Sequence, residues 1–210
     1  MPINTKDREY RDIQVTDLEV REEQDGKKIV EGYATVFDRE YRLWGDDRFQ
    51  ILESVDPRAF ENADMSDVIM QYDHEGRVFA RLSNGTLELK TDDHGLKMRA
   101  DLGGTELGRQ LYEEIRGGYT TKMSFGFSVR KVERKEERNE ETGAITVHRK
   151  ITEIKKLYDV SAVSLPANDA TEISARNIGE GVIAEIEKER LAIEARQRKI
   201  NQIAITAKSF

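Results

Sequence analysis

Cysteine is absent from this sequence of 210 residues. The chain therefore has no disulfide bond, no thiolate ligand for zinc and no cysteine nucleophile. Long apolar runs are missing too, because no stretch approaches the roughly 20 residues that a membrane-spanning helix needs. The first residues also lack the apolar stretch of a secretory signal. These absences are compatible with a protein of the reducing cytoplasm that does not act in a membrane.

An excess of positive charge is missing as well. The chain has 34 lysine and arginine residues against 41 aspartate and glutamate residues, which gives a formal net charge of −7. This acidic balance disfavours broad binding to nucleic acids and to anionic membranes, since both need a basic surface. Hydrophobic residues make up 37% and charged residues 36% of the chain. We therefore expect a folded domain with a modest core and a highly charged surface.

Several common catalytic motifs are also absent. The sequence contains no G-x-S-x-G elbow of the α/β-hydrolases, no P-loop and no glycine fingerprint for a dinucleotide. Its three histidines, His74, His94 and His148, do not form the H-E-x-x-H pattern of a zinc site. We expect neither a metal nor a cofactor.

Alternating apolar residues indicate β-structure over much of the chain. Residues 13–37 and 78–102 each predict a β-hairpin, because β-rich runs flank turns at residues 24–26 and 92–95. A helix is predicted to begin after Thr105. Its apolar face consists of Leu107, Leu111 and Ile115. We predict a fold of the α+β class, mainly antiparallel β, with a few helices and a C-terminal helical tail.

The chain divides into three predicted parts. Residues 1–12 are polar and predict a flexible N-terminus, residues 13–170 predict the folded domain, and residues 171–210 predict a helical tail. Within the domain, residues 130–143 are almost all charged, which indicates an inserted hairpin, either a solvated ribbon or a flexible loop.

The tail is predicted to be a charged helix over residues 180–202. Its thin apolar stripe consists of Ile183, Ile186, Ile193 and Ile200. This stripe is a weak coiled-coil signal. Two interpretations stay open: a solvated helix with no specific role, or a helix that docks its isoleucines on a partner and is then cut off.

Three residues could form a hydrolytic site. Ser124 lies on a predicted strand opposite two phenylalanines, and Gly126 clears the same face. His74 follows a buried apolar run, and Asp159 begins another. A serine hydroxyl becomes a nucleophile only when a base such as imidazole takes its proton, and an acid can orient that imidazole. Alone, each residue equally fits a structural role: a polar strand position, a turn histidine and a strand-edge acid.

Taken together, these segments resemble the prohead (procapsid maturation) serine proteases of tailed phages. That family has a fold related to the herpesvirus assemblin proteases. The matching segments, in chain order, are residues 31–37 (EGYATVF), 55–60 (VDPRAF), the run ending at His74, residues 95–96, 111–115, 123–127 (MSFGF) and 160–167 (VSAVSLPA). The ordered set is specific although each piece alone is weak.

The resemblance implies a barrel-like β core with flanking helices. It places the catalytic serine on Ser124 and the catalytic histidine on His74, with 124 − 74 = 50 residues between them. It implies Asp159 as the third member, although many relatives carry glutamate there. Because the herpesvirus relatives use a second histidine, His148 is the alternative. The oxyanion donors are expected to be backbone N–H groups.

The resemblance also implies a substrate and a place of action. We expect an endopeptidase inside the phage procapsid, in the host cytoplasm, that cleaves scaffold protein or the scaffolding segment of the major capsid protein; members of this family often cleave themselves as well. Its partners would be the major capsid protein or scaffold protein and further copies of itself, with no nucleic acid and no membrane. Two alternatives stay open: a non-catalytic assembly or scaffolding module with the same fold, and a hydrolase that uses carboxylates.

Overall fold

The computed structural model describes residues 8–13, 18–164 and 169–207. The chain forms two units, the first ending at Ser174 and the second beginning at Ala175. The strands are β1 (Glu9–Ile13), β2 (Glu19–Glu22), β3 (Lys28–Val36), β4 (Tyr41–Gly45), β5 (Phe49–Val55), β6 (Ile69–Tyr72), β7 (Glu75–Arg81), β8 (Leu87–Thr91), β9 (Gly95–Asp101), β10 (Lys122–Arg138) and β11 (Ile145–Val163). The helices are η2 (Leu82–Asn84, a 3-10 turn), α1 (Glu106–Arg116) and α2 (Asp169–Ala207).

The strands form two sheets, which confirms the α+β class with largely antiparallel pairing. One sheet has the order β1-β10-β11-β5-β4, with β6 pairing to both β11 and β7, and the other has the order β2-β3-β9-β8. The expected barrel is not found: among the described strands no closed barrel forms, because each sheet ends in edge strands that do not pair with each other. Two pairings are parallel, since the long β11 passes β5 and then β6.

The core lies between the sheets and follows from strand alternation. On β9, Leu96, Met98 and Ala100 are fully buried, while Lys97 and Arg99 between them are half-buried. Successive side chains of a strand point to opposite faces, so one face packs and the other meets water. Each buried aliphatic side chain of this size contributes about 1.5–3 kcal/mol.

Helix α1 begins after Thr105, as the sequence predicts. Thr105 caps it by accepting a hydrogen bond from a backbone amide of the first turn at 3.0 Å. Leu111 and Ile115 are buried as expected. The expectation for Leu107 is wrong, because this side chain is 37% exposed and Tyr112 is buried instead. The buried stripe of the helix therefore runs one position further around its axis.

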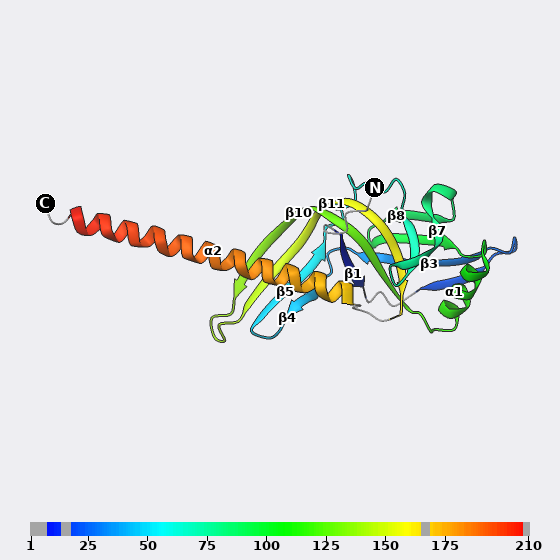
Figure 1. Cartoon of the computed structure of the whole chain (residues 1–210), viewed down its shortest axis with the longest axis horizontal. Coiled ribbons are helices and arrows are strands. Elements are labelled where there is room, and N and C mark those ends of the chain that lie inside the picture. The colour runs from blue at the N-terminus through cyan, green and yellow to red at the C-terminus, as the bar shows by residue number, and fades with distance from the viewer. Residues whose placement is uncertain (1–7, 14–17, 165–168, 208–210) are drawn as a thin grey trace. The chain divides into compact units, whose positions relative to one another are not determined.

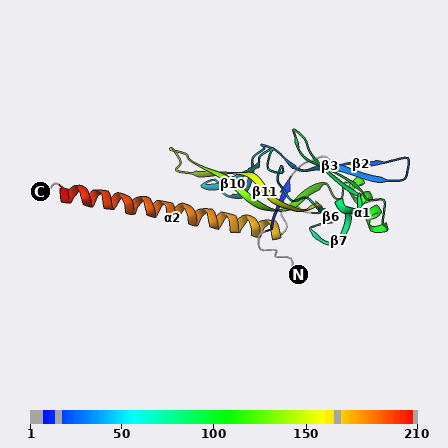
Figure 2. The same cartoon turned by 90° about the horizontal axis from the view of Figure 1, so that it is seen from above.

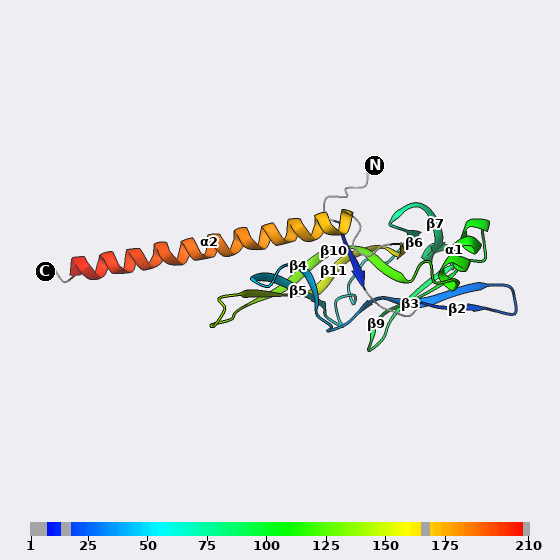
Figure 3. The same cartoon turned by 90° about the horizontal axis from the view of Figure 1, so that it is seen from below.

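Strands β10 and β11 form a long ribbon that includes the charged residues 130–143. The tip of this ribbon is ordered by Asn139, whose side-chain oxygen accepts hydrogen bonds from the backbone amides of Glu141 and Thr142 at 3.0 and 2.9 Å. In Figures 1, 2 and 3 this tip and the β2–β3 hairpin point to opposite ends of the first unit. Of the two interpretations of this segment, the structure has the solvated ribbon.

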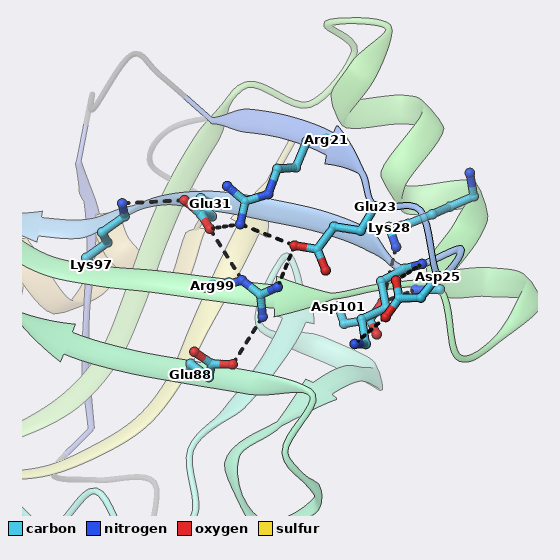
Figure 4. A network of polar contacts seen from close by, with 11 residues as sticks. Arg21, Glu23, Asp25, Lys28, Glu31, Glu88, Lys97, Arg99 and Asp101 are labelled. Carbon is cyan, nitrogen blue, oxygen red and sulfur yellow. Dashed lines mark hydrogen bonds and ion pairs between the residues drawn. The ribbon is translucent and has the colours of Figure 1, made fainter.

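An ion-pair network crosses the second sheet around Arg99 (Figure 4). Arg99 pairs with Glu23 at 3.0 Å, with Glu88 at 3.1 Å and with Glu31 at 3.4 Å. Arg21 adds a pair with Glu31 at 2.8 Å. Because Glu31 and Glu88 stand directly opposite Arg99 on β3 and β8, the pairs favour this register of three strands over a shifted one.

Part of the predicted flexible N-terminus forms a strand, whereas residues 1–7 of it lie outside the described residues. Residues 1–12 were predicted to be flexible, whereas Glu9–Ile13 form β1, which pairs antiparallel with β10. The pattern of this segment is too polar to predict a strand. Besides its pairing with β10, an ion pair holds it, because Arg11 is 1% exposed and contacts the fully buried Glu53 on β5.

Helix α2 is longer than the predicted 180–202, with 39 residues from Asp169 to Ala207. Several large apolar side chains on it are exposed, namely Leu191, Ile193 and Ile200. Glu194 forms ion pairs one helical turn away on both sides, with Arg190 at 3.8 Å and Arg198 at 3.3 Å. Within the described ranges, no helix is long and apolar enough to cross a membrane.

Candidate active site

Ser124 lies in the middle of the first sheet, on β10. Its backbone faces Asp12 of β1 on one side and Ser161 of β11 on the other. The side chain is fully buried. The Ser124 hydroxyl oxygen is 2.7 Å from Nε2 of His74 and 2.9 Å from the carbonyl oxygen of Arg11. A strand interior of this kind holds the hydroxyl rigidly.

His74 occupies the two-residue turn between β6 and β7. Both turn residues have left-handed backbone conformations, with φ of 49° at Asp73 and 60° at His74. Two positive φ values define the hairpin turn that normally favours Asn-Gly. A side chain other than glycine there costs of order 1 kcal/mol or more, and such strain concentrates at functional sites.

Asp73 fixes that turn against β11. Its carboxylate accepts hydrogen bonds from the backbone amide and the hydroxyl of Ser164, both at 2.8 Å. Its own amide donates to the carbonyl oxygen of Ala162 at 2.9 Å. These three bonds offset the strain and hold the imidazole of His74 over the sheet.

Asp159 lies on β11 and is fully buried. Its Oδ1 is 2.6 Å from Nδ1 of His74 and accepts a hydrogen bond from the Ser161 hydroxyl at 2.6 Å. Its Oδ2 contacts the guanidinium of Arg8. Burial alone raises the pKa of Asp159, but the hydrogen bond and charge of His74, together with Arg8 and Ser161, outweigh it and lower the pKa overall. The carboxylate is therefore ionised at neutral pH.

The register of the sheet explains why these side chains converge. Ser124 faces Ser161 and Gly126 faces Asp159 across β10 and β11, so all four share one face. Gly126 has a role that the sequence did not reveal. A Cβ at this position would collide with the Asp159 carboxylate and with the Arg8 side chain. The glycine thus leaves room for the carboxylate.

The other two histidines lie elsewhere. His148 sits in the β10–β11 ribbon, where its Nδ1 is 2.6 Å from a carboxylate oxygen of Glu40. His94 lies in the β8–β9 turn, with its ring centroid 4.5 Å from that of Tyr33. The structure thus brings Asp159 to His74 and places His148 with Glu40. Among the residues that the structure describes, no cluster of three or more histidines and acids is arranged to hold a metal ion.

The model of the caudovirus prohead serine protease family matches residues 16–182 of the chain. The chain belongs to this family. A solved structure, that of the bacteriophage T4 capsid assembly protease, is similar with a TM-score of 0.43 and 12% sequence identity, covering 74% of this chain and 96% of that one. Among curated proteins, none matches the sequence significantly. The resemblance found in the sequence is confirmed at the level of the family.

In this prohead protease family member, the N-terminal strand covers the site, which sequence reasoning missed. The Tyr10 ring lies 4.4 Å from the His74 ring, and burial raises the pKa of the Tyr10 hydroxyl. The Arg8 guanidinium lies 4.8 Å from the centroid of the Tyr158 ring. The side chain of His74 is only 4% exposed as a result. No local pattern predicts this, because the contacts join residues far apart in the sequence.

Proposed function

We propose that this chain is a serine endopeptidase in which Ser124 is the nucleophile, His74 the general base and Asp159 the residue that orients the base. The observation that carries the proposal is the hydrogen-bonded relay from the Ser124 hydroxyl to Nε2 of His74 at 2.7 Å and from Nδ1 to Asp159 at 2.6 Å. Membership of a serine protease family supports it.

The chemistry follows from this geometry. Asp159 accepts a hydrogen bond from the Nδ1–H of His74, so the lone pair of Nε2 faces the serine hydroxyl. His74 takes the hydroxyl proton as the Ser124 oxygen bonds to the substrate carbonyl carbon, and it returns that proton to the leaving amine as the C–N bond breaks. Water then hydrolyses the ester by the same proton path. The ionised Asp159 stabilises the imidazolium that forms in both halves of the reaction.

The substrates that we propose are scaffold protein or the scaffolding segment of the major capsid protein, cleaved inside the procapsid in the host cytoplasm. The family supports this class of substrate. We also propose that the chain associates with further copies of itself. We also propose that the chain cleaves itself, because the carbonyl oxygen of Arg11 in its own β1 accepts a hydrogen bond from the Ser124 hydroxyl at 2.9 Å, which brings that peptide bond next to the nucleophile.

With β1 covering Ser124, the described form of the protein is the inactive one. The Ser124 hydroxyl has one proton, and two acceptors lie within reach of it: Nε2 of His74 and the carbonyl oxygen of Arg11. While β1 is in place the proton is shared between them. Departure of β1 leaves Nε2 as the acceptor and opens the buried serine to other chains.

The test is co-expression with a major capsid protein encoded in the same genome, followed by mass measurement of the shell protein. The wild-type chain should shorten the shell protein, whereas Ser124→Ala and His74→Ala should each slow this by at least about 10³-fold, since members of such a unit fail together. His94→Ala is the matched control and should process normally. Equal processing by Ser124→Ala would refute the serine mechanism, and an uncut shell protein in every sample would favour the non-catalytic assembly module.

A further inference from the structure

Strand β1 lies across the nucleophile as a bound peptide would. It pairs antiparallel with β10, with Asp12 opposite Ser124 and Tyr10 opposite Gly126. The Ser124 hydroxyl donates a hydrogen bond to the carbonyl oxygen of Arg11 at 2.9 Å. When a peptide adds to a sheet edge as a strand, main-chain hydrogen bonds give affinity and pockets for alternate side chains give specificity. The pocket that holds the Arg11 side chain is therefore informative about substrates.

That pocket is built around a buried carboxylate. The Arg11 guanidinium makes a two-point contact with the carboxylate of Glu53, where Nη2 lies 3.2 Å from Oε2 and Nε contacts Oε1. Arg11 is 1% exposed and Glu53 is fully buried. The guanidinium carbon also lies 5.4 Å from the centroid of the Phe127 ring. A planar fork against a carboxylate, next to an aromatic ring, suits arginine better than lysine.

The pocket belongs to the body of the protein and not to β1. Glu53 is on β5, where it also accepts a hydrogen bond from the Tyr41 hydroxyl at 2.5 Å and contacts Arg149 of β11. Burial is the main reason that the pKa of Arg149 is lowered. When β1 leaves, this wall stays behind with its carboxylate.

A second side chain of β1 fits the same wall. Glu9 lies two residues before Arg11 and therefore shares its face of the strand. One carboxylate oxygen of Glu9 is 2.5 Å from the Arg11 guanidinium and 3.5 Å from that of Arg149. Glu9 and Arg11 thus complement Arg149 and Glu53, charge for charge.

Building on the proposed function, we propose that Glu53, Tyr41 and Phe127 form a specificity subsite for arginine at the residue that supplies the scissile carbonyl. An acidic residue two positions earlier adds to recognition through Arg149. The substrate class is therefore a peptide with the pattern Glu-x-Arg before the cut, and β1 carries it as Glu9-Tyr10-Arg11. Cleavage of the chain's own Arg11–Asp12 bond is the first reaction expected.

The experiment uses the full-length protein, incubated first so that it can cleave itself. The substrates are octapeptides that copy residues 8–15 and differ only in the residue that stands at the position of Arg11. We expect kcat/KM to be highest for arginine, lower for lysine, and at least about 30-fold lower for methionine. The Glu53→Gln variant should lose this preference for arginine while it still hydrolyses the methionine peptide. Glu40→Gln, which alters a carboxylate that pairs with His148, is the control and should keep the preference.

The outcomes separate the two proposals. If every peptide is cut without preference, or if Glu53→Gln slows the arginine and methionine peptides equally, Glu53 only anchors β1 and the subsite is wrong. If neither peptides nor shell protein are cut, the proposed function fails and the subsite fails with it. Sequencing the cleaved ends of the shell protein gives an independent check, because arginine should precede the cut.

Discussion

Asp159 combines complete burial with an ionised carboxylate, and its polar neighbours explain how. His74 and Ser161 donate hydrogen bonds to one oxygen, and Arg8 contacts the other. Asp159→Asn keeps the shape but cannot stabilise an imidazolium, so we expect proteolysis to fall by about 10³-fold or more. His148→Ala should change the rate far less, because that side chain contacts Glu40. Peptide hydrolysis by the three proteins compares them directly, and a greater loss in His148→Ala would assign the third role to histidine.

The same carboxylate makes stability depend on pH. Burial opposes ionisation of Asp159, but its hydrogen bonds and nearby charges prevail and lower its pKa below the ordinary 3.8. A lowered pKa in the folded state contributes stability that is present above the ordinary value and lost as pH falls through the folded value. The free energy of unfolding that wild type has in excess of Asp159→Asn should therefore shrink as the pH falls below about 5. Urea titrations at several pH values measure this, and a difference that grows on acidification would contradict it.

Sequence reasoning reached Ser124, His74 and Asp159 but not the residues around them. Each of these three residues lies in a short recognisable segment of the sequence, as Ser124 does with Gly126 two residues later. Arg8, Arg11 and Glu53 were missed because a buried ion pair between β1 and β5 leaves no periodic pattern in either segment. Which of many acids meets which of many bases depends on the tertiary fold.

The β6–β7 hairpin shows how an element positions one side chain. Asp73 and His74 both have positive φ, and the bonds from Asp73 to Ser164 hold the turn against the end of β11. Asp73→Ala should lower kcat by between about 10- and 100-fold with little change in KM, because a displaced base slows chemistry more than binding. Asp73→Asn is the matched control, since asparagine tolerates this backbone and still accepts hydrogen bonds.

Steady-state kinetics and thermal melting together decide the role of Asp73. A raised KM with kcat unchanged, or a lost activity that follows lost folding, would contradict a positioning role.

At the level of elements, hairpins and the capped helix α1 were predictable from turn residues and apolar spacing. The parallel pairings of β11 with β5 and β6 were not. They depend on a 19-residue strand that passes two partners in turn, and nothing in the sequence of β11 marks where one partner ends and the next begins. The open sheets, in place of a barrel, likewise depend on how edge strands meet.

At the scale of the whole molecule, we propose that the long helix α2 docks on a partner through its exposed apolar side chains. Leu191 is 57% exposed and Ile193 is 69% exposed. Truncation after Asn177 should leave peptide hydrolysis by the domain nearly unchanged and lower the amount of protease in purified procapsids, because it removes the apolar side chains that would bind the partner. Quantifying the protease per shell beside a peptide assay gives both numbers. Equal packaging of the two proteins would refute docking, and lost hydrolysis would show that the helix is needed for folding.

Strand β1 carries a consequence for the timing of activity. As a tethered segment it occupies the site at an effective concentration of the order of millimolar, which dilute substrates do not match. The side chains that anchor it, Arg8, Glu9 and Arg11, all precede the Arg11–Asp12 bond. One cut there turns a tethered occupant into a separate peptide, which dilutes away and does not return. Each molecule would then be inhibited by its own β1 until this one cut occurs, and it would remain active afterwards.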